Sequence, residues 1–167
     1  EYPLVTLQDI QQVPDSLLGT DPPSPLNGDT VRVQGIVLVS TVIDPDTNRG
    51  IIISAGPSWT SYIQDPNGSL WGGINIIQQD TTPAAQGTFF DLARLGNLIE
   101  VTGVVFEYNT TTEIKLITSP QPIPISILNG DTVRPTPIEL ELSDLFTSTG
   151  GYNYDAEKYE GMMVKFH

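Results

Sequence analysis

The chain has 167 residues, a formal net charge of −13 and only seven Lys or Arg residues. This acidity leaves no basic stripe for neutralising the phosphates of nucleic acids, and it disfavours an anionic membrane surface. The absence of cysteine rules out disulfides and thiolate metal sites, and no apolar run is long enough to span a bilayer.

Residues 1–27 are expected to form a helical turn followed by a proline-rich connector. Thr6-Leu7-Gln8-Asp9 is a Ser/Thr-x-x-acid helix cap, and Pro14 stops the helical pattern that follows it. Asp21-Pro22-Pro23-Ser24-Pro25 predicts a stiff, extended connection to the first strand.

Two long β-branched segments, Thr30–Ile43 and Leu98–Tyr108, carry the same inner unit, Val-polar-Gly-apolar-Val. The unit is centred on Gly35 in one segment and on Gly103 in the other. A glycine inside a strand weakens it unless a bend or bulge is needed there. Two strands bent at equivalent points are what a small closed barrel requires.

Shorter strands are expected between and after these two segments. A turn at Asp65-Pro66-Asn67-Gly68 joins two of them, and Phe90–Gly96 reads as a short helix ended by glycine. Five strands with a helix between the third and fourth is the order of an OB-fold. We therefore expect an all-β, five-stranded OB-like Greek-key barrel over residues 28–118, with a β-sandwich as the alternative. The three shorter strands are expected at Thr60–Gln64, Gly73–Gln78 and Glu113–Ile117.

Residues 119–167 are expected to form a linker and the first elements of a second OB-like domain. Leu142-Ser143-Asp144-Leu145 resembles Leu7-Gln8-Asp9-Ile10, and Gly161–Phe166 resembles Gly28 and the strand after it, at similar intervals. Chance similarity between short motifs is the alternative interpretation.

The last segment has no strand partner predicted from the sequence. Unpaired strand edges recruit neighbouring strands, so this segment predicts self-association as a filament or a strand-swapped oligomer. The candidate residues are Met162, Met163, Val164, Lys165 and Phe166.

Three segments carry a family resemblance. Tyr62–Gly68 with Trp71–Ile76 is similar to the second and third strands of OB-like domains in exported bacterial proteins, and Val101–Tyr108 with Thr112–Ile114 resembles their last two strands. Glu157–Val164 resembles the opening of a further such domain. These domains occur in secreted endonucleases and in large surface proteins of Bacteroidota. The resemblance implies a secreted or cell-surface location and a non-catalytic role, because catalysis in the nuclease relatives belongs to a separate domain.

One acidic loop has part of a calcium-binding pattern. Asp44, Asp46 and Asn48 have the alternating oxygen-ligand spacing of calcium loops. Gly50 falls one position late, however, and Ala55 stands where a bidentate acid belongs. An ordinary hairpin turn explains the same residues. Calcium is therefore a candidate at this loop, and no other cofactor is predicted.

Aromatic residues fall on or beside the predicted second, third and fourth strands. OB barrels bind ligands on the face of strands 2 and 3, where aromatic rings stack on bases or sugars. The alternative is that most of these rings fill the barrel. The ligand-contact candidates are Trp59, Tyr62, Trp71, Phe106 and Tyr108.

Hydrolytic chemistry has little support in this sequence. The only histidine is His167, so neither a Ser-His-Asp triad nor a two-histidine metal site can be assembled. We expect a non-catalytic structural, assembly or ligand-contact module whose partners are other copies or neighbouring domains of the same protein. A nucleic-acid-binding accessory domain of an extracellular nuclease, and a calcium-dependent or carbohydrate-binding adhesion module, are the alternatives.

Overall fold

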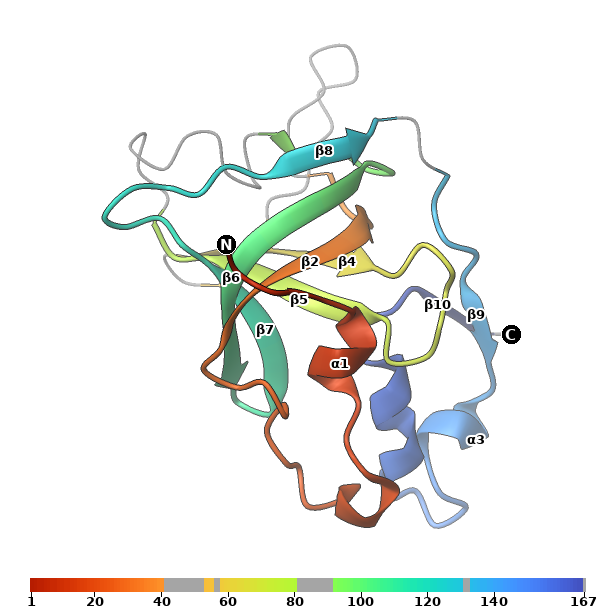
Figure 1. Ribbon diagram of the computed structural model, residues 1–167. Coiled ribbons are helices and arrows are strands. Elements are labelled where there is room, and N and C mark those ends of the chain that lie inside the picture. The colour runs from red at the N-terminus through yellow and green to blue at the C-terminus, as the bar shows by residue number, and fades with distance from the viewer. Residues whose placement is uncertain (41–52, 56–57, 81–91, 131–132, 167) are drawn as a thin grey trace.

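A closed five-stranded barrel forms the centre of the molecule (Figure 1). The computed structural model describes residues 1–40, 53–55, 58–80, 92–130 and 133–166. The strand order is β2-β4-β5-β7-β6, and β6 pairs back onto β2. Only β5 and β7 run parallel within this ring. This is the topology of an OB-fold, so the expected fold class is confirmed. The barrel strands are β2 (Thr30–Val37), β4 (Ser58–Gln64), β5 (Gly73–Gln78), β6 (Leu98–Tyr108) and β7 (Thr111–Leu116).

The two glycine-centred strands lie side by side, as the sequence predicts. In the antiparallel pairing of β2 with β6, Val31 is opposite Gly103 and Gly35 is opposite Ile99. At Ile36, β2 changes neighbour and begins to pair with β4. One curved sheet is therefore closed on itself, and the alternative of two face-packed sheets does not hold.

The N-terminal segment plugs the barrel. Strand β1 (Leu4–Val5) runs parallel to β2, and α1 (Leu7–Gln11) follows with the expected capping box between Thr6 and Asp9. Leu7 and Ile10 of α1 are 2% and 0% exposed and belong to the main hydrophobic cluster. Burial of each such side chain stabilises the fold by about 1.5–3 kcal/mol. A short 3-10 turn, η1 (Asp15–Leu17), leads into the connector.

Several element bounds differ from the expected ones. Strand β2 ends at Val37, where its pairing with both β6 and β4 has ended, and positions 41–43 of the expected strand lie outside the described residues. Strand β3 (Ile53–Ala55) pairs with β4. The expected helix at 90–96 lies partly outside the described residues, and Gly96 has a positive φ of 82°.

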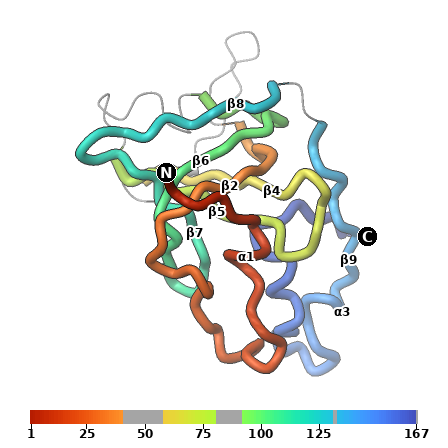
Figure 2. The backbone as a smooth tube through the Cα atoms, viewed as in Figure 1, coloured from red at the N-terminus to blue at the C-terminus, as the bar shows by residue number. Residues whose placement is uncertain are grey.

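An unpredicted strand, β8 (Ser126–Asn129), pairs with β6 inside the segment expected to be a linker. Figure 2 shows its trace following that of β6 across one end of the barrel. All four of its side chains are exposed, so it has no alternation of buried and exposed residues that would mark it as a strand.

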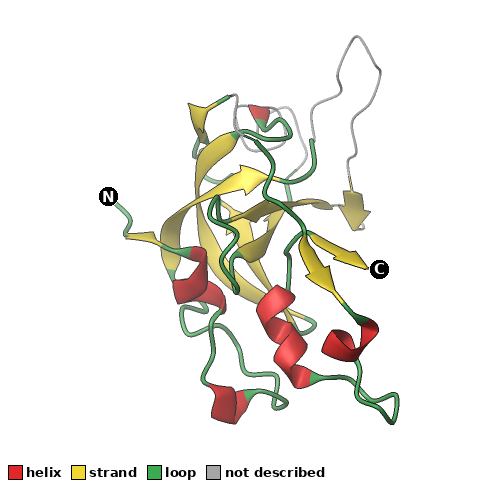
Figure 3. Ribbon diagram, turned by 90° about the vertical axis from the view of Figure 1, so that its right-hand side faces the viewer, coloured by secondary structure: helices red, strands yellow, loops and turns green. Residues whose placement is uncertain are grey.

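The last part of the chain folds into a small unit beside the barrel, which we call the C-terminal unit (residues 138–166; Figure 3). Strand β10 has β9 as a parallel partner, which the sequence did not predict, and Met162 and Met163 precede β10. Pro137 comes directly before β9, at the strand boundary where proline is tolerated. The elements are β9 (Ile138–Leu140), α3 (Leu142–Leu145), η3 (Tyr154–Tyr159) and β10 (Val164–Phe166).

Replacing Gly103 with alanine tests barrel closure. A Cβ at Gly103 would lie 2.5 Å from Ile114 Cγ2 and 2.7 Å from the Lys115 carbonyl oxygen, so backbone must shift. Gly103→Ala should lower the free energy of unfolding by about 1–3 kcal/mol, measured by urea denaturation. Gly130→Ala is the control, because the nearest atom to its Cβ is 3.9 Å away. It should change stability by less than about 0.5 kcal/mol. Equal effects of the two substitutions would contradict a closure that depends on tight packing at Gly103.

Candidate functional site

A row of polar side chains crosses the outer surface of the barrel. Tyr62 on β4 is opposite Asn75 on β5, which is opposite Glu113 on β7. Each of the three is next to an isoleucine of the core in its strand. Because successive side chains of a strand point to opposite faces, these three side chains point out of the barrel. We call these three residues the outer row. Asn75 and Glu113 are nevertheless only 7% and 5% exposed. This face of the barrel is therefore not an open, solvated surface.

The C-terminal unit docks at the β4–β5 hairpin end of the same face. The Met163 N–H donates to Gln64 Oε1 at 2.8 Å, and the Trp71 N–H donates to the Lys158 carbonyl oxygen at 2.8 Å. Gln64 is the last residue of β4, and its side chain is fully buried. Specific hydrogen bonds thus hold the two parts together.

The closest approach in this interface is between two glycines. A Cβ on Gly73, the first residue of β5, would lie 2.5 Å from both the Gly161 carbonyl oxygen and the Met162 nitrogen. Gly161 has a positive φ of 66°, a conformation that side-chain-bearing residues adopt at a cost. Backbone therefore packs directly on backbone, which only glycines at these two positions permit.

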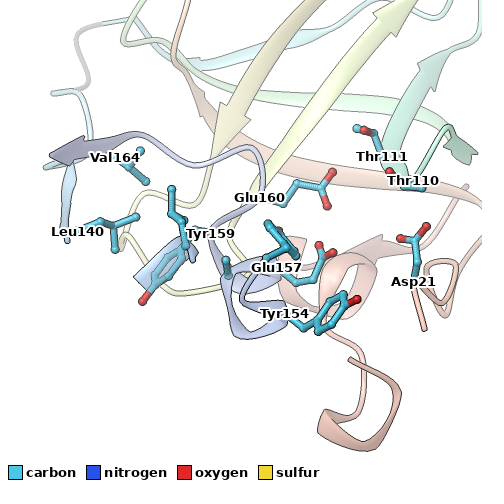
Figure 4. Close-up of a pocket in the computed structure, with 12 residues that line it drawn as sticks. Asp21, Thr110, Thr111, Leu140, Tyr154, Glu157, Tyr159, Glu160 and Val164 are labelled. Carbon is cyan, nitrogen blue, oxygen red and sulfur yellow. The ribbon is translucent and has the colours of Figure 1, made fainter. Parts of the chain in front are cut away.

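A cavity of about 450 Å³ lies between the β6–β7 turn and the C-terminal unit (Figure 4). In the close-up, the side chains of Asp21, Glu157 and Glu160 face the same space. One wall is acidic and hydroxyl-bearing, and the other is apolar and aromatic. The lining residues are Asp21, Thr110, Thr111, Leu140, Leu145, Tyr152, Tyr154, Ala156, Glu157, Tyr159, Glu160 and Val164.

Two carboxyl groups of this cavity, those of Glu157 and Glu160, have raised pKa values. Burial raises the pKa of Glu160 from 4.5 to about 7, and Glu157 and Glu107 add to the rise. The Thr112 backbone N–H donates to Glu160 and opposes part of this shift. Burial, with the nearby Asp21 and Glu107, also raises the pKa of Glu157. We call Asp21, Glu107, Glu157 and Glu160 the acidic seam between the barrel and the C-terminal unit. Because the pKa of Glu160 is about 7, the seam is partly protonated near neutral pH.

Two residues of the outer row, Glu113 and Tyr62, also have raised pKa values. Burial, followed by the charge of Glu107, raises the pKa of Glu113, and burial with Glu113 and Glu160 raises that of Tyr62. Glu113 Oε1 accepts from Asn75 Nδ2 at 3.0 Å. Glu113 Oε2 and Asn75 Oδ1 are buried without a hydrogen-bonding partner among the described residues. An unpaired buried oxygen disfavours the charged carboxylate.

The five aromatic candidates occupy different surroundings. Trp59 packs against the hydrophobic cluster, Tyr62 lies in the outer row, and Trp71 contacts the C-terminal unit. Phe106 and Tyr108 are exposed near the end of β6, and the Lys115 ammonium lies 5.7 Å from the Phe106 ring centre. Their role as ligand contacts stays a prediction.

The calcium candidates Asp44, Asp46 and Asn48 lie outside the described residues. In the part of the chain that is described, no group of three or more His, Cys, Asp or Glu side chains is arranged to hold a metal ion. Nor is any helix within those ranges long and apolar enough to cross a membrane.

Sequence reasoning did not find the acidic seam. No motif in the sequence marks Asp21, Glu107, Glu157 or Glu160 as a site. These residues come from the connector, the end of β6 and η3. Only the tertiary fold brings them together, so no local motif could have predicted the seam.

The chain matches no protein-family model and no curated protein. Among solved structures it is similar to an OBody bound to hen egg-white lysozyme, with 20% identity over 62% of this chain and 84% of the other, and a TM-score of 0.41. An OB-fold domain of replication protein A from Methanococcus maripaludis shares 15% identity over 65% and 91%, with a TM-score of 0.35. An aspartyl-tRNA synthetase from Leishmania major shares 14% over 99% and 26%, with a TM-score of 0.45. These likenesses are distant, and the fold assignment rests on the strand pairing itself.

Neutralising Glu160 should make the protein more stable at high pH. Because its pKa of about 7 in the folded state exceeds the ordinary 4.5, the stabilising contribution is present below pH 4.5 and is lost as pH rises through 7. Glu160→Gln keeps an acceptor for the Thr112 N–H and removes the buried charge. At pH 8 it should raise the melting temperature by about 2–8 °C, with little change at pH 5.

The control for this experiment is Asp29→Asn, at an exposed acid outside the seam. It removes the same charge and should leave the melting temperature nearly unchanged at both pH values. A Glu160→Gln effect of the same size at pH 5 and pH 8 would show that Glu160 does not titrate in this range.

Proposed function

We propose that this chain is a non-catalytic structural module of a secreted or cell-surface bacterial protein, with its OB-type ligand face committed to packing within the chain. The observation that carries the proposal is the contact of Gly73 with the Gly161–Met162 backbone. OB barrels use the face of strands 2 and 3 for ligands, and here those strands are β4 and β5. A face joined to the next structural unit serves assembly rather than exchange of a soluble ligand.

Hydrogen bonding supports a permanent junction. The Gln64 side chain is fully buried while it accepts from the Met163 N–H. Separating the two parts would leave Gln64 and the backbone groups of 158–163 to be resolvated. Each such hydrogen bond that is exchanged for hydrogen bonds to water loses about 0.5–1.5 kcal/mol. The junction is therefore built to stay closed.

The charge at this face supports the same proposal against the nucleic-acid alternative. Asp21, Glu107, Glu157 and Glu160 lie close to Glu113 of the outer row. Repulsion within this group of acids contributes to the raised pKa values of Glu113, Glu157 and Glu160. A phosphate backbone approaching these carboxylates would be repelled, and nucleic-acid binding depends on phosphate neutralisation by Lys and Arg.

The extracellular location is supported by composition and by the resemblance described above. Many Thr, Ser, Asn and Gln residues and a low content of charged residues are typical of exported surface proteins. The proposed partners are neighbouring domains or further copies of the same protein.

Alanine at Gly73 tests the junction. Its Cβ would collide with the Gly161 and Met162 backbone, so Gly73→Ala should loosen the C-terminal unit while the barrel stays folded. Limited proteolysis should then cut within 157–163 about tenfold faster than in the unmodified chain, because the cut needs local opening. Gly130→Ala should not change the rate. Equal cleavage in both variants would contradict a committed junction.

Titrations with DNA and with calcium distinguish the structural role from the nuclease-accessory and adhesion alternatives. Fluorescence anisotropy with labelled single-stranded and double-stranded DNA at about 50 mM salt should show no binding. Binding that weakens steeply with salt would replace the structural role with the nuclease-accessory role. A calcium-dependent rise in melting temperature that is lost in Asp46→Ala would favour the adhesion module instead.

A further inference from the structure

The C-terminal unit repeats the way the barrel begins. In both places a short strand leads into a capped helix, and a later strand returns parallel to the first, as β2 does beside β1 and β10 beside β9. Each helix has a capping box closed by an aspartate at its third position, Asp9 in α1 and Asp144 in α3. Gly28 lies four residues before Arg32, and Gly161 lies four residues before Lys165, which occupies the same place in the strand pairing; both glycines have a positive φ.

The equivalence extends to single residues. When β10 is placed on β2 by these glycines, Lys165 falls on Arg32, and the residues opposite them, Glu139 on β9 and Leu4 on β1, also correspond. The ion pairs themselves differ, because Lys165 pairs with Glu139 whereas Arg32 pairs with Glu1 and with Glu100 of β6. The match now involves strand direction, helix cap and backbone conformation as well as sequence. This makes chance similarity of short motifs a weaker explanation.

The N-terminal and C-terminal strand–helix–strand units differ in how far their apolar side chains are buried. Placing α3 on α1 by the capping aspartates puts Leu145 on Ile10 and Leu142 on Leu7. Ile10 and Leu7 are 0% and 2% exposed in the barrel core, whereas Leu142 is 67% exposed. Leu145 is half-buried and lines the cavity of Figure 4.

The same contrast holds for the returning strand. Val31 and Val33 of β2 are buried at 1% and 0%, while Phe166, the equivalent of Val33, is 45% exposed. Val164, the equivalent of Val31, lines the cavity together with Leu145. The C-terminal unit therefore carries the apolar pattern of a barrel core, and in the part of the chain that is described only β9 and β10 form its sheet.

One edge of β10 is oriented to receive such a strand. The Ile138 N–H donates to the Met163 carbonyl oxygen, so the Met163 carbonyl group and, two residues on, the backbone groups of Lys165 face β9. Because alternate residues present theirs to opposite edges, Val164 and Phe166 face away from β9. In the first copy the corresponding edge, at Val31 and Val33, pairs with β6. Among the described residues, β10 has only β9 as a strand partner.

We propose that residues 138–166 are the opening strand–helix–strand unit of a second barrel, and that the free edge of β10 binds an antiparallel, glycine-kinked strand of the β6 type. The partner is recognised by its chemistry: β-branched residues alternate along it to cover Leu142, Leu145 and Phe166, and a central glycine allows close approach. This inference goes beyond the structural role proposed above, and either can fail without the other.

The test uses the full chain and a synthetic peptide with the sequence of Leu98–Tyr108, flanked by lysines for solubility. The peptide should bind saturably, and amide exchange at Val164 and Phe166 should slow about tenfold or more, as newly paired strand amides do. A peptide of the same composition in scrambled order should do neither. Val164→Pro, which removes one donor from the free edge, should weaken binding about tenfold, whereas Val164→Thr should not.

Three outcomes would overturn the inference: no binding of the ordered peptide, protection confined to Val31 and Val33, or protection of β10 amides in the chain alone together with dimerisation. The second would mean that the peptide invades the first barrel, and the third that a second copy is the partner. Far-UV circular dichroism and the Gly73-dependent proteolysis pattern report independently on folding and on the junction. A failed peptide experiment therefore leaves the structural role standing.

Discussion

The pairing of β2 with β6 is the constraint on which the rest of the molecule depends. It joins the first and fourth strands of the barrel over seven successive residue pairs, from Thr30 with Val104 to Ile36 with Leu98. Because the ring is then complete, the strands enclose one core, and that core needs a plug at its open end. Leu7 and Ile10 of α1 supply it. Closure also fixes which side chains point outward, and so creates the outer row on which the candidate site is built.

The site follows from the way in which a second unit is joined to that outer face. Backbone-on-backbone contact between Gly73 and Gly161 brings η3 against the β6–β7 turn, and η3 carries Glu157 and Glu160 with it. Their carboxylates would be well solvated in water, but here they are placed beside Glu107. Burial and repulsion together raise their pKa values. The acidic seam is thus an electrostatic cost of the junction, and protonation reduces that cost.

The barrel was predictable from the sequence because its signals are local. Glycines at equivalent places in two β-branched strands, the Asp65–Gly68 turn and the Thr6–Asp9 cap each act within a few residues. Strand β8 was missed because its side chains are all exposed, and the β9–β10 pair because parallel partners lie far apart in the chain. No pattern within a few residues of Gly73 or of Gly161 predicts that the two glycines are in contact. In the sequence Gly73 only begins an expected strand, and Gly161 only resembles Gly28.

Comparison of the two strand–helix–strand units shows why one sequence pattern gives two degrees of burial. A capped helix and a parallel strand pair form from local and medium-range interactions, so both units adopt them. Burial of the apolar face needs strands that come later in the chain, and β4 and β6 supply these to the first unit. In the C-terminal unit Leu140, Ala156 and Met162 are buried, while Leu142 and Phe166 stay exposed. The contact of Gly73 with Gly161 joins this unit to the barrel, and the exposed Leu142 and Phe166 are the positions that the strand proposed above would cover.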